Sequence, residues 1–535
     1  MPQFQSRLVA AGPAYDDNRQ YLLGLIAELR GLEARARAAS AKAGPRFAKR
    51  GQLLPRERLG LLLDAGAPFL ELSALAGYLR DKPDPATSIP GGGFIAGIGQ
   101  ISGVRCFLVV DDSGIDAGAL QPMGLEKFLR AQEIALAMKL PFVHLVESAG
   151  ANLLGYRVQD FVTGGSIFRN LARHSAAGLP VVALVHGSST AGGAYMTGLA
   201  DYVVMVRGRA RAFLAGPPLL KAATGEIATD EDLGGADMHA TVSGLAEYLA
   251  EDDTDGIRIA REVIGQLGTA EPLPSGPEPR LPADELLGLM PRDGKKPVDM
   301  REVAARIVDE SVLLEFKPGY GAATICLQAR LCGMPIGIVT NNGPIDPDGA
   351  AKATHFIQAC CQSGTPLIYL QNTTGFIVGT AAERGGVIKH GAKMIQAVAN
   401  ATVPQITILC AASYGAGNYG MCGRGLAPSF LFAWPNARTA VMGGEQAALT
   451  MAIVMEDGAR ARGLPVDEVQ IAGLKAKVVE NFERQTSAFY TSGLMLDDGV
   501  IDPRDTRRVL ALTLAVCAEA RRRQPNRLNF GVARP

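Results

Sequence analysis

The sequence predicts an α/β fold that occurs twice along the chain. Two apolar runs, 180–185 and 404–410, are typical of buried strands, and each leads into a glycine-rich turn. Gly192 lies 12 residues after the start of the first run, and Ala416 lies 12 residues after the start of the second. Another pair of apolar runs begins 39 and 38 residues upstream of these two. Such similar spacing indicates an internal duplication and therefore two similar domains.

The length and composition limit the class of protein. A chain of 535 residues is too long for one hydrophobic core. Prolines concentrated over 271–297 predict a linker between an N-terminal domain, 1–270, and a C-terminal domain, 298–535. The 53 basic and 53 acidic residues balance, so the net charge favours neither nucleic acid nor an anionic membrane as a partner.

The sequence also predicts a cytoplasmic protein with no metal site. No apolar run reaches the ~18 residues of a transmembrane helix, and the N-terminus lacks the basic and apolar pattern of a signal peptide. The eight cysteines form no C-x-x-C pair, which indicates reduced core cysteines. The six histidines show neither metal-ligand spacing nor a catalytic-triad pattern.

Helices and strands alternate along the first half, as in layered α/β folds. The pattern predicts a polar helix over 18–45, short strands over 95–103 and 106–110, and helices over 124–138 and 255–267. The second half repeats the strand and turn and ends in a helix over 504–523.

The glycine turns are the candidate functional feature. Where a strand runs into glycines and a helix begins, the first amide N–H groups have no acceptor within the helix. Without a Cβ in the way, these groups can approach an oxygen that carries negative charge. The pattern therefore predicts an oxyanion hole at Gly192 and Gly193, and a second anion-stabilising turn at the matching position around Ala416.

Longer motifs resemble a known family. The segments 49–59, 68–72, 213–226, 385–393 and 434–446 resemble those of the carboxyltransferase β subunits of biotin-dependent acyl-CoA carboxylases, and the resemblance runs from about residue 18 to 530. It implies two crotonase-like domains, each a ββα superhelix. It also implies a CoA thioester as substrate and a partner α subunit that contains the biotin carboxylase and the biotin carboxyl carrier. The β subunits of this family form a hexamer, in which the first domain of one protomer faces the second domain of another.

The same resemblance implies the roles of the site residues. Gly192 and Gly193 would hold the thioester oxygen, and Ala416 and Gly417 the ureido oxygen of biotin. Carboxybiotin then releases CO2, the biotin anion takes the substrate proton and the substrate carbanion attacks CO2, so no protein nucleophile is required. The residues assigned to the substrate are Gly164, Ala191, Ala194, Tyr195, Lys127 and Phe376, and those assigned to biotin are Gly415, Asn418 and Tyr419. For Lys127, a CoA phosphate contact and a place on a solvated helix face are both open.

One position bears on the choice of acyl-CoA. The segment 417–423 resembles the branch of the family that carboxylates the γ carbon of 3-methylcrotonyl-CoA or geranyl-CoA. Methylcrotonyl enzymes carry a Phe where this chain has Gly164, and Ala381-Ala382 stands where larger residues usually occur. A longer apolar chain in the space gained contributes about 0.8 kcal/mol per buried CH2. We therefore predict geranyl-CoA, in acyclic terpene catabolism, with 3-methylcrotonyl-CoA, in leucine catabolism, as the alternative.

Other classes of protein fit the sequence less well. The stretch 415–420 matches the G-x-G-x-x-G dinucleotide fingerprint, but the next acidic residue, Glu445, lies 25 residues past Gly420. A crotonase-like hydratase needs paired carboxylates, for which Glu147 alone is a poor candidate. The chain has no Walker A sequence and no Met-Lys-Met biotin-attachment site. A biotin-dependent decarboxylase subunit would use the same two turns, and a non-enzymatic scaffold would bind no acyl-CoA.

Overall fold

The computed structural model describes residues 3–150, 157–463 and 465–533. Its contacts divide the chain into two compact units. The first unit comprises Gly31–Pro272, Gly493–Met495 and Val516–Pro535, and the second comprises Met1–Arg30, Leu273–Ser492 and Leu496–Ala515. The beginning of the chain therefore packs with its later part, and the end of the chain packs with its earlier part.

The first unit is built on a mixed sheet with the strand order β1-β2-β3-β4-β5-β6-β8, in which β7 pairs with β5. The strands β1 to β3 are antiparallel, and the pairings from β3 onward are parallel. Every residue of β3 and β4 is buried, as expected for central strands covered on both faces. The strands are β1 (Leu70–Leu72), β2 (Phe94–Ile101), β3 (Val104–Asp111), β4 (Phe142–Ser148), β5 (Val181–Thr190), β6 (Tyr202–Val206), β7 (Arg211–Phe213) and β8 (Tyr248–Ala250).

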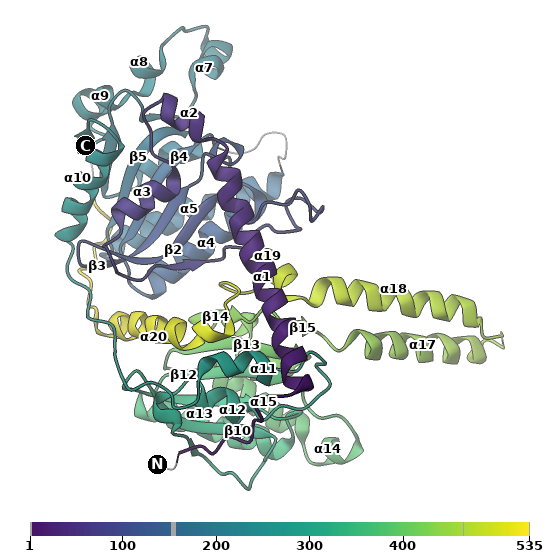
Figure 1. The fold of residues 1–535 in the computed structure, drawn as a ribbon. Helices are drawn as coiled ribbons and strands as arrows, with labels where there is room; N and C mark the ends of the chain where they lie inside the picture. Colours follow the sequence, from purple (N-terminus) through teal and green to yellow (C-terminus); the bar gives the residue numbers. More distant parts are fainter. Residues whose placement is uncertain (1–2, 151–156, 464, 534–535) are drawn as a thin grey trace. The chain divides into compact units, whose positions relative to one another are not determined.

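Helices cover this sheet (Figure 1). α4 packs beside α5, and α10 packs beside α3 and against β5 and β6. The helices of this part of the chain are α2 (Gly44–Lys49), α3 (Pro55–Leu62), α4 (Pro122–Ala137), α5 (Val158–Ala176), α6 (Gly192–Gly198), α7 (Pro217–Thr224), α8 (Asp230–Gly234), α9 (Ala236–Met238) and α10 (Asp253–Gly265).

The second unit repeats this plan. Its sheet has the order β14-β13-β12-β11-β10-β9, with β15 beside β13, just as β7 lies beside β5. The strands are β9 (Leu314–Glu315), β10 (Thr324–Leu331), β11 (Met334–Asn341), β12 (Leu367–Thr373), β13 (Gln405–Tyr414), β14 (Phe430–Ala433) and β15 (Arg438–Ala440). The helices of this part of the chain are α11 (Leu286–Leu289), α12 (Met300–Ala305), α13 (Pro347–Ser363), α14 (Thr380–Arg384), α15 (Val387–Ala399), α16 (Gly417–Gly420), α17 (Gly444–Ala461), α18 (Glu468–Thr486), α19 (Ala488–Gly493) and α20 (Thr506–Arg522), and the last residues of α19 and α20 belong to the first unit. The predicted duplicated α/β fold is confirmed.

Two features differ from the sequence-based expectation. The single helix expected over 18–45 is α1 (Pro13–Ala41) followed by the separate α2, because Pro45 stands in the first turn of α2 and cannot continue the preceding helix. The hairpin of α17 and α18 is unexpected: its two helices pack on each other and extend away from the sheet of their unit (Figure 1).

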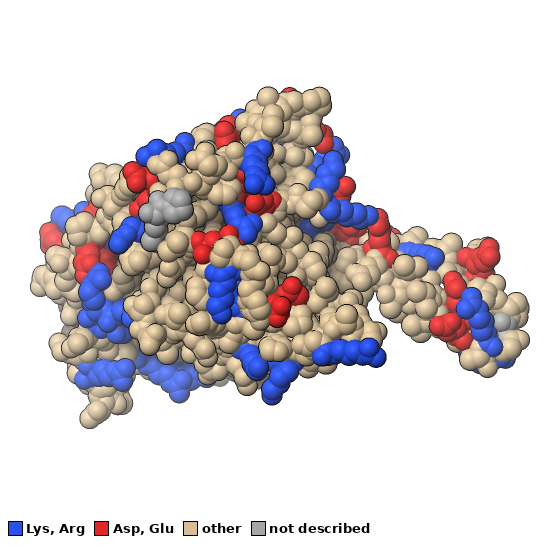
Figure 2. Space-filling model, turned by 90° about the horizontal axis from the view of Figure 1, so that it is seen from below, with Lys and Arg blue, Asp and Glu red and all other residues tan. Residues whose placement is uncertain are grey.

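The surface carries both signs of charge. Both basic and acidic side chains occur on the face shown in Figure 2, in keeping with the equal totals of the sequence. Among the helices of residues 3–150, 157–463 and 465–533, we find none that has both the length and the apolar character needed to span a bilayer.

Candidate active site

The first glycine turn leaves two amide groups free. β5 ends at Thr190, and Ala191 then takes a positive φ of 54° and donates its own N–H to the carbonyl of Phe213 at 3.0 Å. α6 begins at Gly192, so the N–H groups of Gly192 and Gly193 have no backbone acceptor among the described residues. Two adjacent free donors at the end of a buried strand are suited to bind an oxyanion.

The second turn has the same backbone plan. β13 ends at Tyr414, and Gly415 takes a φ of 56° and donates its N–H to the carbonyl of Ala440 at 2.9 Å. The amides of Ala416 and Gly417 then stand where those of Gly192 and Gly193 stand in the first unit, and in the described part of the chain they have no backbone acceptor. The equal spacing in the sequence thus corresponds to the same backbone arrangement at the two turns.

The glycine at the second turn fits its place tightly. A Cβ on Gly417 would lie 2.8 Å from the Cα of Gly375 and 3.0 Å from the side chain of Thr373. At the first turn, a Cβ on Gly192 would lie 3.3 Å from the ring of Phe168, and one on Gly193 would lie 3.3 Å from the hydroxyl of Ser189. The second turn is therefore closed by backbone and the first by side chains that can move.

Side chains hold the second turn from behind. The hydroxyl of Ser413 donates to Gln371 at 2.6 Å and accepts a bond from the amide of Asn418 at 2.7 Å. Gln371 donates in turn to the carbonyl of Met421 at 2.7 Å. Asn418, expected among the biotin-binding residues, is thus already bonded inside the turn. Tyr419, which follows it, is 51% exposed and available for a ligand.

A buried charged network holds the strand that carries the first turn. Arg58 donates to Glu147 at 2.6 Å and to Asp253 at 3.0 Å, and all three side chains are almost fully buried. His186 of β5 bonds through Nδ1 to Asp253 at 2.9 Å. Gln52 donates to Glu147 and to the carbonyl of His186.

The protonation states of this network follow from burial and from its hydrogen bonds. Burial lowers the pKa of His186, so its ring is neutral and donates through Nδ1. Burial opposes ionisation of Asp253, but the His186 hydrogen bond and the charge of Arg58 outweigh it and lower the pKa of Asp253 to about 2. The motifs do not reveal this network, because Arg58, Glu147 and Asp253 lie far apart in the sequence.

Lys127, expected to be near a CoA phosphate, has a different place. Its ammonium is buried and donates to the carbonyls of Gly91 at 3.0 Å and Phe94 at 2.6 Å, and burial lowers the pKa of Lys127 to about 8. The side chain of Lys127 therefore does not lie on a solvated helix face. Lys352 of the second unit occupies the equivalent position in α13 and donates to the carbonyls of Lys317 and Tyr320. Both lysines hold the turn that precedes the second strand of their unit, β2 and β10.

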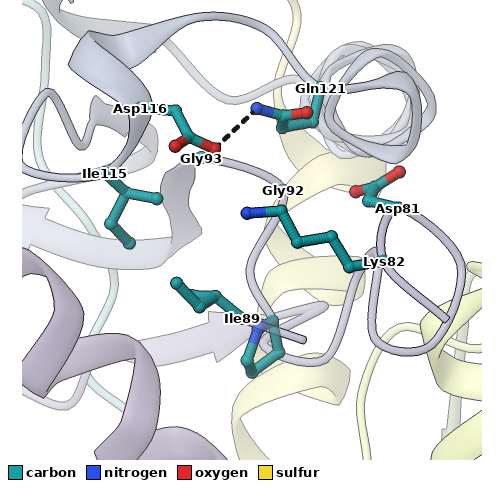
Figure 3. A pocket seen from close by; sticks show the side chains of 9 residues that line it. Asp81, Lys82, Ile89, Gly92, Gly93, Ile115, Asp116 and Gln121 are labelled. Carbon is teal, nitrogen blue, oxygen red and sulfur yellow. Dashed lines mark hydrogen bonds between the residues drawn. The ribbon is translucent and has the colours of Figure 1, made fainter. Parts of the chain in front are cut away.

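A small surface pocket is lined in part by Gly92 and Gly93, which belong to the turn that Lys127 holds (Figure 3). Gln121 donates to Asp116 at 2.9 Å on one side of this pocket, and the amino group of Lys82 points toward it from another. The lining residues are Asp81, Lys82, Ile89, Pro90, Gly92, Gly93, Ile115, Asp116 and Gln121. None of the residues predicted for the active site lines it.

The remaining predicted residues separate by unit. Ala191, Ala194, Tyr195 and Gly164 lie in the first unit at α6 and on the neighbouring α5, and no atom lies within 4 Å of the place where a Cβ on Gly164 would stand.

Phe376 lies in the second unit, where its ring packs against the Cα positions of Gly391 and Gly420 and belongs to the edge of the core. Among the described residues there is no group of three or more His, Cys, Asp or Glu side chains that could hold a metal ion.

Comparison with known proteins identifies the family. The carboxyl transferase domain family matches residues 46–530, and the chain belongs to it. The chain is 54% identical to the crystal structure of the P. aeruginosa geranyl-CoA carboxylase β subunit, with a TM-score of 0.93 over 99% of this chain and 100% of the other. It is 47% identical to a probable biotin-dependent acyl-coenzyme A carboxylase β2 subunit of Mycobacterium tuberculosis, covering 99% of each chain.

A third relative is the biotin-dependent 3-methylcrotonyl-coenzyme A carboxylase β1 subunit of the same organism, 45% identical over 96% of this chain and 97% of that protein. The resemblance predicted from the motifs is confirmed, and the chain is an enzyme subunit, a carboxyltransferase β subunit.

Proposed function

We propose that this chain is the carboxyltransferase subunit of a geranyl-CoA carboxylase, which moves a carboxyl group from carboxybiotin to the γ carbon of geranyl-CoA. The observation that carries the choice of substrate is the open space at Gly164 on α5, next to the helix that begins at the first turn. A Phe at this position would fill that space, and its absence leaves room for an apolar chain. The similarity to the P. aeruginosa β subunit supports the same choice.

The two turns supply the electrostatics of the reaction. The amides of Gly192 and Gly193 donate to the thioester oxygen, where charge gathers when the γ proton leaves and a dienolate forms. Removal of one such fixed donor typically costs about 3 kcal/mol of transition-state stabilisation. The amides of Ala416 and Gly417 would hold the ureido oxygen of biotin, and carboxybiotin, when bound, would supply the CO2.

The close approach of Gly417 to Gly375 supports a bare backbone cradle at the second turn, since a side chain there would displace the amides. Tyr419, exposed beside this turn, is the residue we assign to contact the biotin ring.

The activity requires a partner. We assign biotin and its carboxylation to an α subunit, and we propose that the β subunits assemble with one another into a hexamer. The hairpin of α17 and α18 supports self-assembly, because Leu449, Ile453 and Val454 on α17 are each about half exposed or more. Sedimentation of the purified chain measures this directly. The eight free thiols fit a reducing compartment, and we place the reaction in the cytoplasm.

The decisive experiment is carboxylation with the biotinylated α subunit, ATP and labelled bicarbonate, comparing geranyl-CoA with 3-methylcrotonyl-CoA. We expect a preference for geranyl-CoA that Gly164→Phe abolishes while turnover of 3-methylcrotonyl-CoA continues. Val162→Phe is the matched control, because Val162 is 69% exposed but, two residues from Gly164, lies on the opposite side of α5.

A preference of the unchanged protein for 3-methylcrotonyl-CoA would place the protein in leucine catabolism and refute the Gly164 argument. No turnover of either substrate would favour a decarboxylase subunit.

A further inference from the structure

Helix α5 carries an exposed aromatic side chain, Phe161. The helix buries Ile167, Leu171, His174 and Ser175 against the sheet, whereas Phe161 is 72% exposed. Phe161 and Phe168 are seven residues apart and therefore lie on one face of the helix, two turns from each other. A large exposed aromatic ring beside a binding site points to a ligand contact.

One end of this aromatic face reaches the first glycine turn. The ring of Phe168 would lie 3.3 Å from a Cβ on Gly192, and it meets the ring of Tyr195 edge to face, with the centroids 6.2 Å apart. The face therefore begins beside the amides that bind the thioester oxygen, and it leads from there toward Phe161.

The interval between the two phenylalanines is open. Gly164 and Gly165 lie between them along the helix, and no atom is within 4 Å of the Cβ position of either. Phe161 and Phe168 are about 10 Å apart along the helix axis, because an α-helix rises about 1.5 Å per residue. One isoprene unit of an extended acyl chain is about as long as one helical turn, about 5 Å. An acyl chain that follows this face from the first turn would place its first isoprene unit beside Phe168 and Gly164, and its second unit would reach Phe161.

We propose that Phe161 is a specificity-determining residue that contacts the distal isoprene unit of the acyl chain. The inference rests on the proposed function and adds a second position to Gly164: the glycine admits the longer chain, and Phe161 binds its far end. Contact between an aromatic ring and an alkenyl chain buries apolar area that 3-methylcrotonyl-CoA is too short to cover.

The test is Phe161→Ala in the assembled α/β holoenzyme, with kcat/KM measured for both acyl-CoA substrates. We expect kcat/KM for geranyl-CoA to fall about tenfold, mostly through KM, and that for 3-methylcrotonyl-CoA to stay unchanged. Phe161→Leu, which keeps an apolar side chain, should recover part of the loss. Val162→Ala is the matched control, because Val162 is 69% exposed and faces another direction from the next position of the helix.

The outcomes separate this inference from the function on which it rests. If the unchanged protein does not carboxylate geranyl-CoA, the proposed function fails and this inference fails with it. If geranyl-CoA is carboxylated but Phe161→Ala leaves kcat/KM unchanged for both substrates, the proposed function stands and the role of Phe161 is refuted. The same holds if the variant lowers kcat/KM equally for both substrates.

Discussion

The two glycine turns share one backbone plan, but different contacts hold them. Behind the first turn lies a buried charged network of Arg58, Glu147, Asp253 and His186. Behind the second lies a neutral chain of hydrogen bonds that centres on Gln371. Since the free amides are arranged alike in both, the comparison teaches that the geometry of the turn is set by strand, turn and helix, and that its support is interchangeable.

The largest change in the free energy of unfolding is expected from the charged network behind the first turn, which has only a neutral counterpart behind the second. Arg58→Met leaves Glu147 and Asp253 buried without their cation, so it should lower the free energy of unfolding by about 3–5 kcal/mol. Gln371→Leu is the neutral counterpart at the second turn, and it should cost only about 1–3 kcal/mol. Urea unfolding measures both. Equal losses would show that the charge of the first network is irrelevant to its cost.

The next effect tests how the turns are closed. Gly417→Ala forces a methyl group against the Cα of Gly375, so the amides must move, and we expect kcat to fall by about 10²-fold. Gly192→Ala meets only the ring of Phe168, which can shift, and should cost markedly less. Steady-state kinetics on both variants provides the comparison. A larger fall in kcat for Gly192→Ala than for Gly417→Ala would contradict this explanation.

The charged support also makes the first turn sensitive to acid. The pKa of Asp253 is lowered from its ordinary 3.8 to about 2 in the folded protein, so its contribution of about 2 kcal/mol is fully present above about pH 4. It is lost as the pH falls from about 4 through 2, where the folded protein takes up the proton. Asp253→Asn should flatten the pH dependence of stability in that window. An unchanged acid profile for this variant would contradict the assignment.

The smallest effect concerns the residue that opens each turn. The first unit places Ala191 at a positive φ where the second unit has Gly415. Ala191→Gly should relieve strain and leave stability within about 1 kcal/mol of the original, whereas Gly415→Ala should cost about 1–2 kcal/mol. Thermal unfolding of the two single variants and of the double variant measures the change in stability from each substitution and from both together. A larger loss from Ala191→Gly than from Gly415→Ala would reverse the comparison.

The parts of the structure that the sequence predicts well are local. Each turn is defined within about a dozen positions by an apolar run, by glycines and by the small residues that begin the next helix. The spacing of Gly192 and Ala416 therefore predicts that these two positions are equivalent. The predicted strands and the helices after them follow from the same short-range pattern. By contrast, the network around Arg58 joins residues about 90 and 195 positions apart, and no periodicity records such a pairing.

Side-chain direction is the second limit of the sequence. Lys127 follows the exposed Glu126 on α4, and only the fold shows that its ammonium turns inward to two carbonyls. Asn418 is similar, since its amide bonds to Ser413 inside the turn. The hairpin of α17 and α18 is not predicted, because several of its large apolar side chains are exposed in their own unit and give no clear buried face: Leu449, Met451, Ile453, Val454 and Val469.

The exchange of chain ends between the units has a consequence for synthesis. Arg105 of β3 pairs with Glu519, and the carbonyl of Ala176 accepts a bond from the amide of Leu528. The ribosome must therefore have translated residues 519 and 528 before the first unit can close these contacts. The opening segment, by contrast, must wait for Glu302, whose carboxylate accepts bonds from Ser6 and Arg7. Neither unit is formed by one continuous segment of the chain. Cleavage between 271 and 297 would therefore give two pieces, each of which lacks residues of its unit that the other piece contains.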